Sequence, residues 1–85
     1  MIYPQNNLNT LYLESIVMER KTEKILDNLR KARISQKISL LNLANMIEIS
    51  HSHLYYIENK RVIPSIDIVI KLAKALNVTF MNLLE

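Results

Sequence analysis

Residues 39–58, SLLNLANMIEISHSHLYYIE, have the pattern of two short helices joined by a tight turn. Ser39 and Ser50 each stand where a hydroxyl can cap the first turn of a helix, and Glu48 and Ile49 form the predicted turn. The apolar face of the first helix repeats at spacings of three and four and consists of Leu40, Leu43, Ala44 and Ile47. The stretch therefore predicts a helix, a turn and a second helix.

The second of these helices has an unusual surface. Leu54 and Ile57 lie three residues apart and form one buried stripe. The other positions are polar but nearly uncharged, and apart from the terminal acid Glu58 they are His51, Ser52, His53, Tyr55 and Tyr56. Solvated helix faces ordinarily carry charged side chains, whereas His, Ser and Tyr suit a partner rich in hydrogen-bonding groups. We interpret this segment as the recognition helix of a DNA-binding helix-turn-helix.

The composition is that of one small domain. The chain has 85 residues, of which 49% are hydrophobic, and this is enough for one compact core. Cysteine is absent, which removes disulfides and thiolate metal sites and favours a reducing compartment. Neither a membrane span nor a signal-peptide pattern is present, so we expect a cytoplasmic protein with no membrane partner. The net charge of +3 and the pI near 9.3 fit a nucleic-acid binder.

The N-terminal quarter of the chain is predicted as an extension. Residues 1–10 have the composition of a loose arm, and residues 11–18 fit either an alternating strand or one face of a helix. The charged residues in and after this segment favour the helix. Thr22 can cap a new helix that runs to about Ser35, with Ile25, Leu26, Leu29 and Ala32 on its apolar face. We therefore predict residues 1–22 as an N-terminal arm or extension and a possible dimerisation element.

The C-terminal third adds two further helices. Pro64 disfavours a helix at the residue before it, and Ser65 and Thr79 can each cap a new one. The expected apolar faces are Ile66, Val69, Leu72, Ala73 and Leu76 in the first helix and Phe80, Leu83 and Leu84 in the second. Since the chain has no glycine, left-handed helix ends are expected on Asn59 and Asn77. Residues 23–85 are thus predicted as a compact all-α domain of five helices.

From about residue 23 onward, the pattern resembles a known family, the phage-repressor and Cro type of helix-turn-helix domain (the Xre family). The residues that carry the resemblance are Ile38, Ser39, Leu43, Ala44, Ile49, Ser50, Leu54, Ile57, Glu58, Pro64, Ser65 and the run from Lys71 to Val78. The resemblance covers roughly three quarters of the chain and implies a compact lambda-repressor-like fold. It also implies a DNA-binding transcriptional regulator, with a repressor as the expected type.

The resemblance assigns roles to residues of the second motif helix. In this family that helix lies in the major groove and its N-terminal residues contact base edges. The matching residues here are His51, Ser52 and Tyr56. Ser50, Asn59 and Arg61 match positions that usually reach phosphates, and the side-chain chemistry of His53, Tyr55 and Lys60 adds three further expected backbone contacts. Arg33 matches a basic residue that often pairs inside the fold with the acid at Glu58, so the two are expected to form a structural ion pair.

Several residues depart from the family pattern. A glutamine often stands where this chain has Leu40, which cannot donate a hydrogen bond to the DNA backbone. Glycine often stands where Lys37, Glu48 and Lys60 occur here. These departures keep open a second hypothesis from another class, in which the fold is a protein-interaction module, as in antitoxins, with weak or no DNA binding.

An enzyme and a metal protein are not expected. The sequence has no nucleophile–base pair and no glycine-rich phosphate loop. His51 and His53 diverge because they are two apart on a helix, so no metal or other cofactor is predicted. The expected partners are double-stranded DNA and a second copy of the chain, with a protein partner under the alternative hypothesis. Dimer contacts are expected either at Val78, Phe80, Met81 and Leu84 or within residues 11–18.

Overall fold

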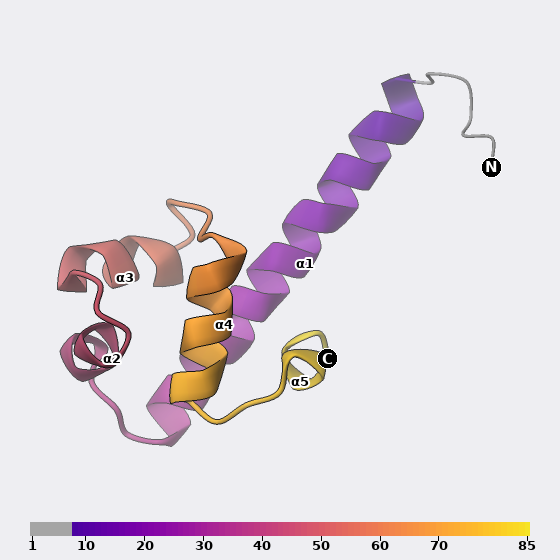
Figure 1. Ribbon diagram of the computed structural model, residues 1–85. Coiled ribbons are helices and arrows are strands. Elements are labelled where there is room, and N and C mark those ends of the chain that lie inside the picture. Colours follow the sequence, from indigo (N-terminus) through magenta and orange to yellow (C-terminus); the bar gives the residue numbers. More distant parts are fainter. Residues whose placement is uncertain (1–7) are drawn as a thin grey trace.

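The computed structural model of the chain describes residues 8–85, which form five helices joined by short connections (Figure 1). The helices are α1 (Leu8–Ser35), α2 (Leu40–Met46), α3 (His51–Glu58), α4 (Ile66–Ala75) and α5 (Phe80–Leu83). The prediction of an all-α fold with five helices is confirmed. None of the helices in the described part of the chain is long and apolar enough to cross a membrane.

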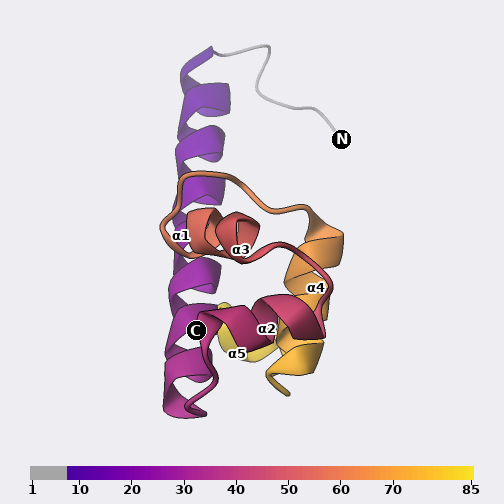
Figure 2. The same ribbon diagram turned by 90° about the vertical axis from the view of Figure 1, so that its left-hand side faces the viewer.

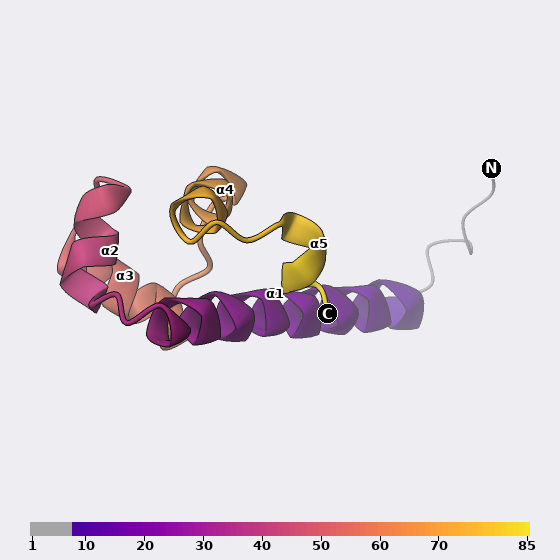
Figure 3. The same cartoon turned by 90° about the horizontal axis from the view of Figure 1, so that it is seen from below.

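Helix α1 determines the shape of the molecule. Its 28 residues span about 42 Å, which is close to the longest dimension of the molecule, 47 Å. Helices α2 to α5 all lie on one side of α1, toward its C-terminal end, and the N-terminal part of α1 projects beyond them (Figures 2 and 3).

The range of α1, Leu8–Ser35, tests two expectations from the sequence. The helical prediction for residues 11–18 is confirmed, and the strand alternative is wrong. The predicted helix start at Thr22 is also wrong, because α1 continues through that residue. A threonine caps a helix only where the chain enters from extended backbone, and Thr22 has helix on both sides.

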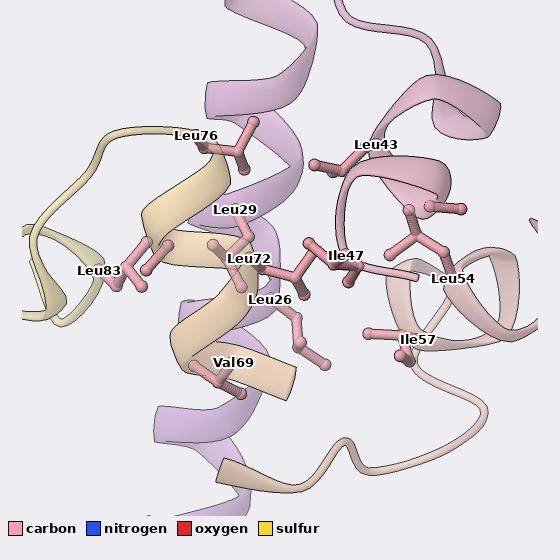
Figure 4. Close-up of a cluster of buried hydrophobic side chains, with 12 residues drawn as sticks. Leu26, Leu29, Leu43, Ile47, Leu54, Ile57, Val69, Leu72, Leu76 and Leu83 are labelled. Atoms are coloured by element: carbon pink, nitrogen blue, oxygen red, sulfur yellow. The ribbon is translucent and has the colours of Figure 1, made fainter. Parts of the chain in front are cut away.

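The core lies between α1 and the four short helices (Figure 4). All five helices contribute to it, and its buried residues are Leu26, Leu29, Leu43, Ala44, Ile47, Leu54, Ile57, Val69, Leu72, Ala73, Leu76 and Leu83. Burying one such leucine or isoleucine side chain stabilises the fold by about 1.5–3 kcal/mol. Three residues of the predicted apolar faces are exposed: Ile66, Phe80 and Leu84, of which the last two were also expected at a dimer contact. Ile66 is the first residue of α4, and the four-residue helix α5 turns only Leu83 inward.

Two side-chain amides, one on α1 and one in the turn directly after it, fix the C-terminal helices. Asn28 donates a hydrogen bond through Nδ2 to the carbonyl of Leu83 at 2.8 Å. Gln36 donates through Nε2 to the carbonyl of Leu76 at 2.6 Å. These bonds satisfy carbonyls at the ends of α4 and α5, and they hold both helices against α1.

Four side-chain caps begin the short helices as predicted. The hydroxyls of Ser39, Ser50, Ser65 and Thr79 each accept a hydrogen bond from the backbone N–H three residues later, at 3.0 to 3.3 Å. Each of these residues has extended backbone, as a cap requires. The caps fix where α2, α3, α4 and α5 begin.

Four residues with positive φ end the longer helices: Lys37 (59°), Glu48 (61°), Lys60 (61°) and Asn77 (55°). In each case the next N–H bonds to the carbonyl five residues before it, which is the Schellman arrangement. The expectation for Asn77 is confirmed, and the one for Asn59 is wrong, since its φ is −90°. The left-handed position falls one residue later, on Lys60, because Asn59 is the C-cap of α3.

Candidate nucleic-acid interface

Helix α3 is held in one orientation about its axis. Leu54 and Ile57 are fully buried and point into the core (Figure 4). At the N-terminal end, Ser50 Oγ accepts the N–H of His53 at 3.0 Å and fixes the first turn. Ala44 of α2 is also fully buried, and its small side chain allows α2 to pack closely against its neighbours. The rest of α3 is therefore turned away from the core.

The outward face of α3 consists of neutral hydrogen-bonding groups. His51, Ser52, Tyr55 and Tyr56 are exposed, and His53 is half-buried. The rings of Tyr55 and Tyr56 meet edge to face, with centroids 5.8 Å apart and planes at 72°. Such a pair is mutually attractive and restrains both rings. The face thus presents hydroxyls and imidazoles that can donate or accept hydrogen bonds, together with two restrained aromatic surfaces.

All nine residues expected to contact DNA lie on α3, at its cap or in the turn after it: Ser50, His51, Ser52, His53, Tyr55, Tyr56, Asn59, Lys60 and Arg61. Three of them make polar contacts within the protein, and one of these is Ser50, whose Oγ accepts the N–H of His53. Asn59 donates through Nδ2 to the carbonyl of Tyr55 at 2.8 Å, and Lys60 Nζ lies 2.9 Å from Asp27 Oδ1 on α1. Arg61 is exposed on the loop that follows. If Lys60 contacts a phosphate, it must give up its ion pair with Asp27. A phosphate contact by Arg61 leaves the pair between Lys60 and Asp27 intact.

An ion pair connects α3 to α1. Arg33 donates through Nε and Nη2 to the two carboxylate oxygens of Glu58, at 2.7 and 2.9 Å, and through Nη1 to the carbonyl of Ile38 at 3.0 Å. Arg30 Nε lies 4.0 Å from the same carboxylate. The Glu58 side chain is only 9% exposed and sits at the C-terminal end of α3, where the helix dipole disfavours an acid. The positive charge of Arg33 therefore offsets the free-energy cost of the nearly buried Glu58 carboxylate at this end of the helix.

Positive charge lies beside the motif and not within it. Residues 39–59 contain no Lys or Arg and two acids, Glu48 and Glu58. The exposed cations nearest to the motif in the sequence are Lys37, in the turn before α2, and Lys60 and Arg61, after α3. Lys37 was absent from the expected contact set. Lys37 stands two residues before the cap Ser39, so its place beside the motif could have been read from the sequence.

The two histidines of α3 do not form the beginning of a metal site. His51 is exposed and His53 is half-buried, and residues two apart on a helix point in nearly opposite directions. Within residues 8–85, no group of three His, Asp or Glu side chains could hold a metal ion. The hydroxyls, imidazoles and aromatic rings of this face can form hydrogen bonds and stacking contacts.

The comparison with protein families identifies the same region. The family model HTH_3, described as helix-turn-helix, matches residues 29–81. The match begins in the C-terminal part of α1 and includes α2, α3 and α4 with the Arg33–Glu58 pair. No curated protein and no solved structure matches the chain.

Proposed function

Since the chain belongs to the HTH_3 family of DNA-binding helix-turn-helix domains, we propose that it is a sequence-specific transcriptional regulator that inserts α3 into the major groove. The outward face of α3 is the observation that carries this proposal. The buried Leu54 and Ile57 fix the orientation of the helix about its axis. Its exposed side is polar but lacks the Lys and Glu side chains that are usual on a solvated helix. No catalytic role is proposed.

The proposed assignment of base contacts and DNA-backbone contacts follows the chemistry of the side chains. His51, Ser52 and Tyr56 contact base edges, since an imidazole N–H suits guanine O6 or N7 and a hydroxyl suits any base. The contacts to the DNA backbone come from Ser50, His53, Tyr55, Asn59, Lys60 and Arg61. Backbone contacts supply affinity and register, and base contacts supply the choice of sequence.

We propose further that the protein is a repressor and binds a palindromic operator as a dimer. One α3 reaches only a few base pairs, so two copies on two half-sites extend the recognised sequence. A two-fold symmetric dimer matches a palindromic site. A small dimer that occupies a promoter in this way excludes other proteins from it.

The dependence of DNA affinity on salt tests the proposal. With Lys37 and Arg61 engaged in each protomer, a dimer neutralises roughly four phosphates, and Lys60 raises this to roughly six. The plot of log K against log salt should then have a slope of about −4 to −5, which is a loss of roughly 10²–10³-fold between 50 and 200 mM salt. Fluorescence anisotropy with a labelled mixed-sequence duplex measures this slope.

The alternative proposal is a protein-interaction module of the antitoxin type, with weak or no DNA binding. The lack of Lys and Arg in residues 39–59 favours it, as do the acid at Glu48 and the half-buried Leu40 in place of a donor. Under this alternative, no DNA binding is measurable at 50 mM salt, where electrostatic binding is strongest. The same titration therefore separates the two functions.

A further inference from the structure

Lys60 is held by an acid on another helix. It follows the C-cap of α3, and its Nζ lies 2.9 Å from Asp27 Oδ1 on α1, beside which α3 lies (Figure 2). The side chains of Lys60 and Asp27 are 37% and 48% exposed, so water reaches both. An ion pair in contact with water adds little stability and opens at small cost. A competing anion can therefore take the place of Asp27.

Asp27 is the last of three acids along one side of α1. Glu19, Glu23 and Asp27 are spaced four residues apart, so each lies one helical turn after the one before it. Glu19 and Glu23 line a groove of about 410 Å³ together with Lys60. The ammonium group of Lys60 therefore lies on a strongly acidic side of α1, and within residues 8–85 it forms an ion pair with Asp27.

Arg61 is the neighbouring cation and differs in this respect. Its side chain is exposed on the loop after α3, and no acid in the described part of the chain pairs with it. Both cations are assigned to the DNA backbone in the proposed function. A phosphate contact by Lys60 replaces an existing contact, whereas one by Arg61 adds a new contact. The two cations should therefore contribute unequally to DNA affinity.

We propose that Asp27 is a positioning residue that retains Lys60 on α1 and so limits the contribution of this lysine to DNA affinity. The carboxylate of Asp27 and a DNA phosphate present the same kind of anionic oxygen to one ammonium group, so they compete for it. Asp27 acts through Lys60 and makes no contact with DNA. This inference rests on the proposed function and deepens it, because it names the residue that regulates one of the backbone contacts.

The variant Asp27→Asn tests the proposal, because it removes the charge and keeps the shape of the side chain. Release of Lys60 should raise the affinity for a labelled mixed-sequence duplex about two- to fivefold per protomer, the range set by the strength of an exposed ion pair. The salt slope should become steeper by up to about 1 per protomer, since one more cation displaces counterions. Fluorescence anisotropy measures both quantities, and circular dichroism checks that the variant is folded.

The matched control is Asp67→Asn. It makes the same change of charge at an exposed position in the first turn of α4. It therefore reports the general effect of removing one negative charge from the protein. The gain in affinity from Asp27→Asn should exceed that of Asp67→Asn, and an equal or smaller gain would overturn the proposal.

Lys60→Ala shows whether Asp27 acts through the lysine. In the wild type, this substitution should lower DNA affinity less than about twofold, because Lys60 is retained by Asp27. Combined with Asp27→Asn, it should remove the gain beyond that of Asp67→Asn, since the two residues are coupled. A gain that persists without Lys60 would show that the carboxylate repels DNA directly, and this result would contradict the proposal.

A failure of this inference is distinguishable from a failure of the proposed function. If the wild type binds the duplex at 50 mM salt, where electrostatic binding is strong, and Asp27→Asn binds no more tightly, the proposal for Asp27 is wrong and the proposed function stands. If neither the wild type nor any of these variants binds DNA at that salt concentration, the proposed function is wrong and the role of Asp27 is rejected with it.

Discussion

Removal of Arg33 is expected to destabilise the whole domain. Its guanidinium donates two hydrogen bonds to Glu58 and one to the carbonyl of Ile38. The two side chains are 14% and 9% exposed, so Arg33→Ala leaves a carboxylate that water barely reaches. Loss of one partner from a buried pair costs about 3–5 kcal/mol. Arg30, at 4.0 Å, offsets part of this loss, so we expect a cost of about 3 kcal/mol.

The expected change is large for a chain of this size. Its free energy of unfolding should be about 4–13 kcal/mol, and a loss of about 3 kcal/mol lowers Tm by roughly 12–24 °C. Thermal unfolding followed by circular dichroism measures the shift, with Lys31→Ala on the exposed side of α1 as the matched control. Adding Glu58→Gln to Arg33→Ala should recover part of the loss, because the amide carries no charge. An Arg33→Ala shift no larger than that of Lys31→Ala would refute the reasoning.

The turn and the recognition face provide further tests. Glu48→Gly should stabilise the fold by about 1 kcal/mol, because glycine accepts the φ of 61° without strain, and Glu48→Ala should not; thermal unfolding compares them. His51→Ala should relax base choice at one position of each half-site, measured by competition between duplexes. Arg61→Ala should weaken binding to all sequences about equally and make the salt slope shallower by about 1 per protomer. If neither His51→Ala nor Arg61→Ala alters DNA binding, the assigned face is wrong.

The starts of the short helices could be predicted because each depends on local chemistry. A serine or threonine followed by an apolar repeat was sufficient to predict where α2 to α5 begin. In each case the hydroxyl accepts the capping hydrogen bond. The same rule failed at Thr22, since a residue suited to a cap is also tolerated inside a helix. The expectation for Asn59 failed by one residue, because the position of the left-handed turn depends on where the last helical hydrogen bond forms.

Contacts between distant parts of the chain were harder to predict. The pair between Lys60 and Asp27 joins residues whose proximity depends on how α3 packs against α1, and no local pattern signals it. The pair between Arg33 and Glu58 could be anticipated only from the family resemblance. For the interface, the buried stripe of Leu54 and Ile57 predicted which side of α3 faces outward. The DNA contacts of individual residues on that side remain predictions.

Selection of bound sequences from a random duplex pool tests most directly whether the outward face of α3 reads DNA. The wild-type protein should enrich one palindromic motif, and His51→Ala should lose the preference at one position in each half-site while it keeps the others. Absence of any enriched motif at low salt, or the same motif for wild type and for variants of His51, Ser52 and Tyr56, would contradict the account.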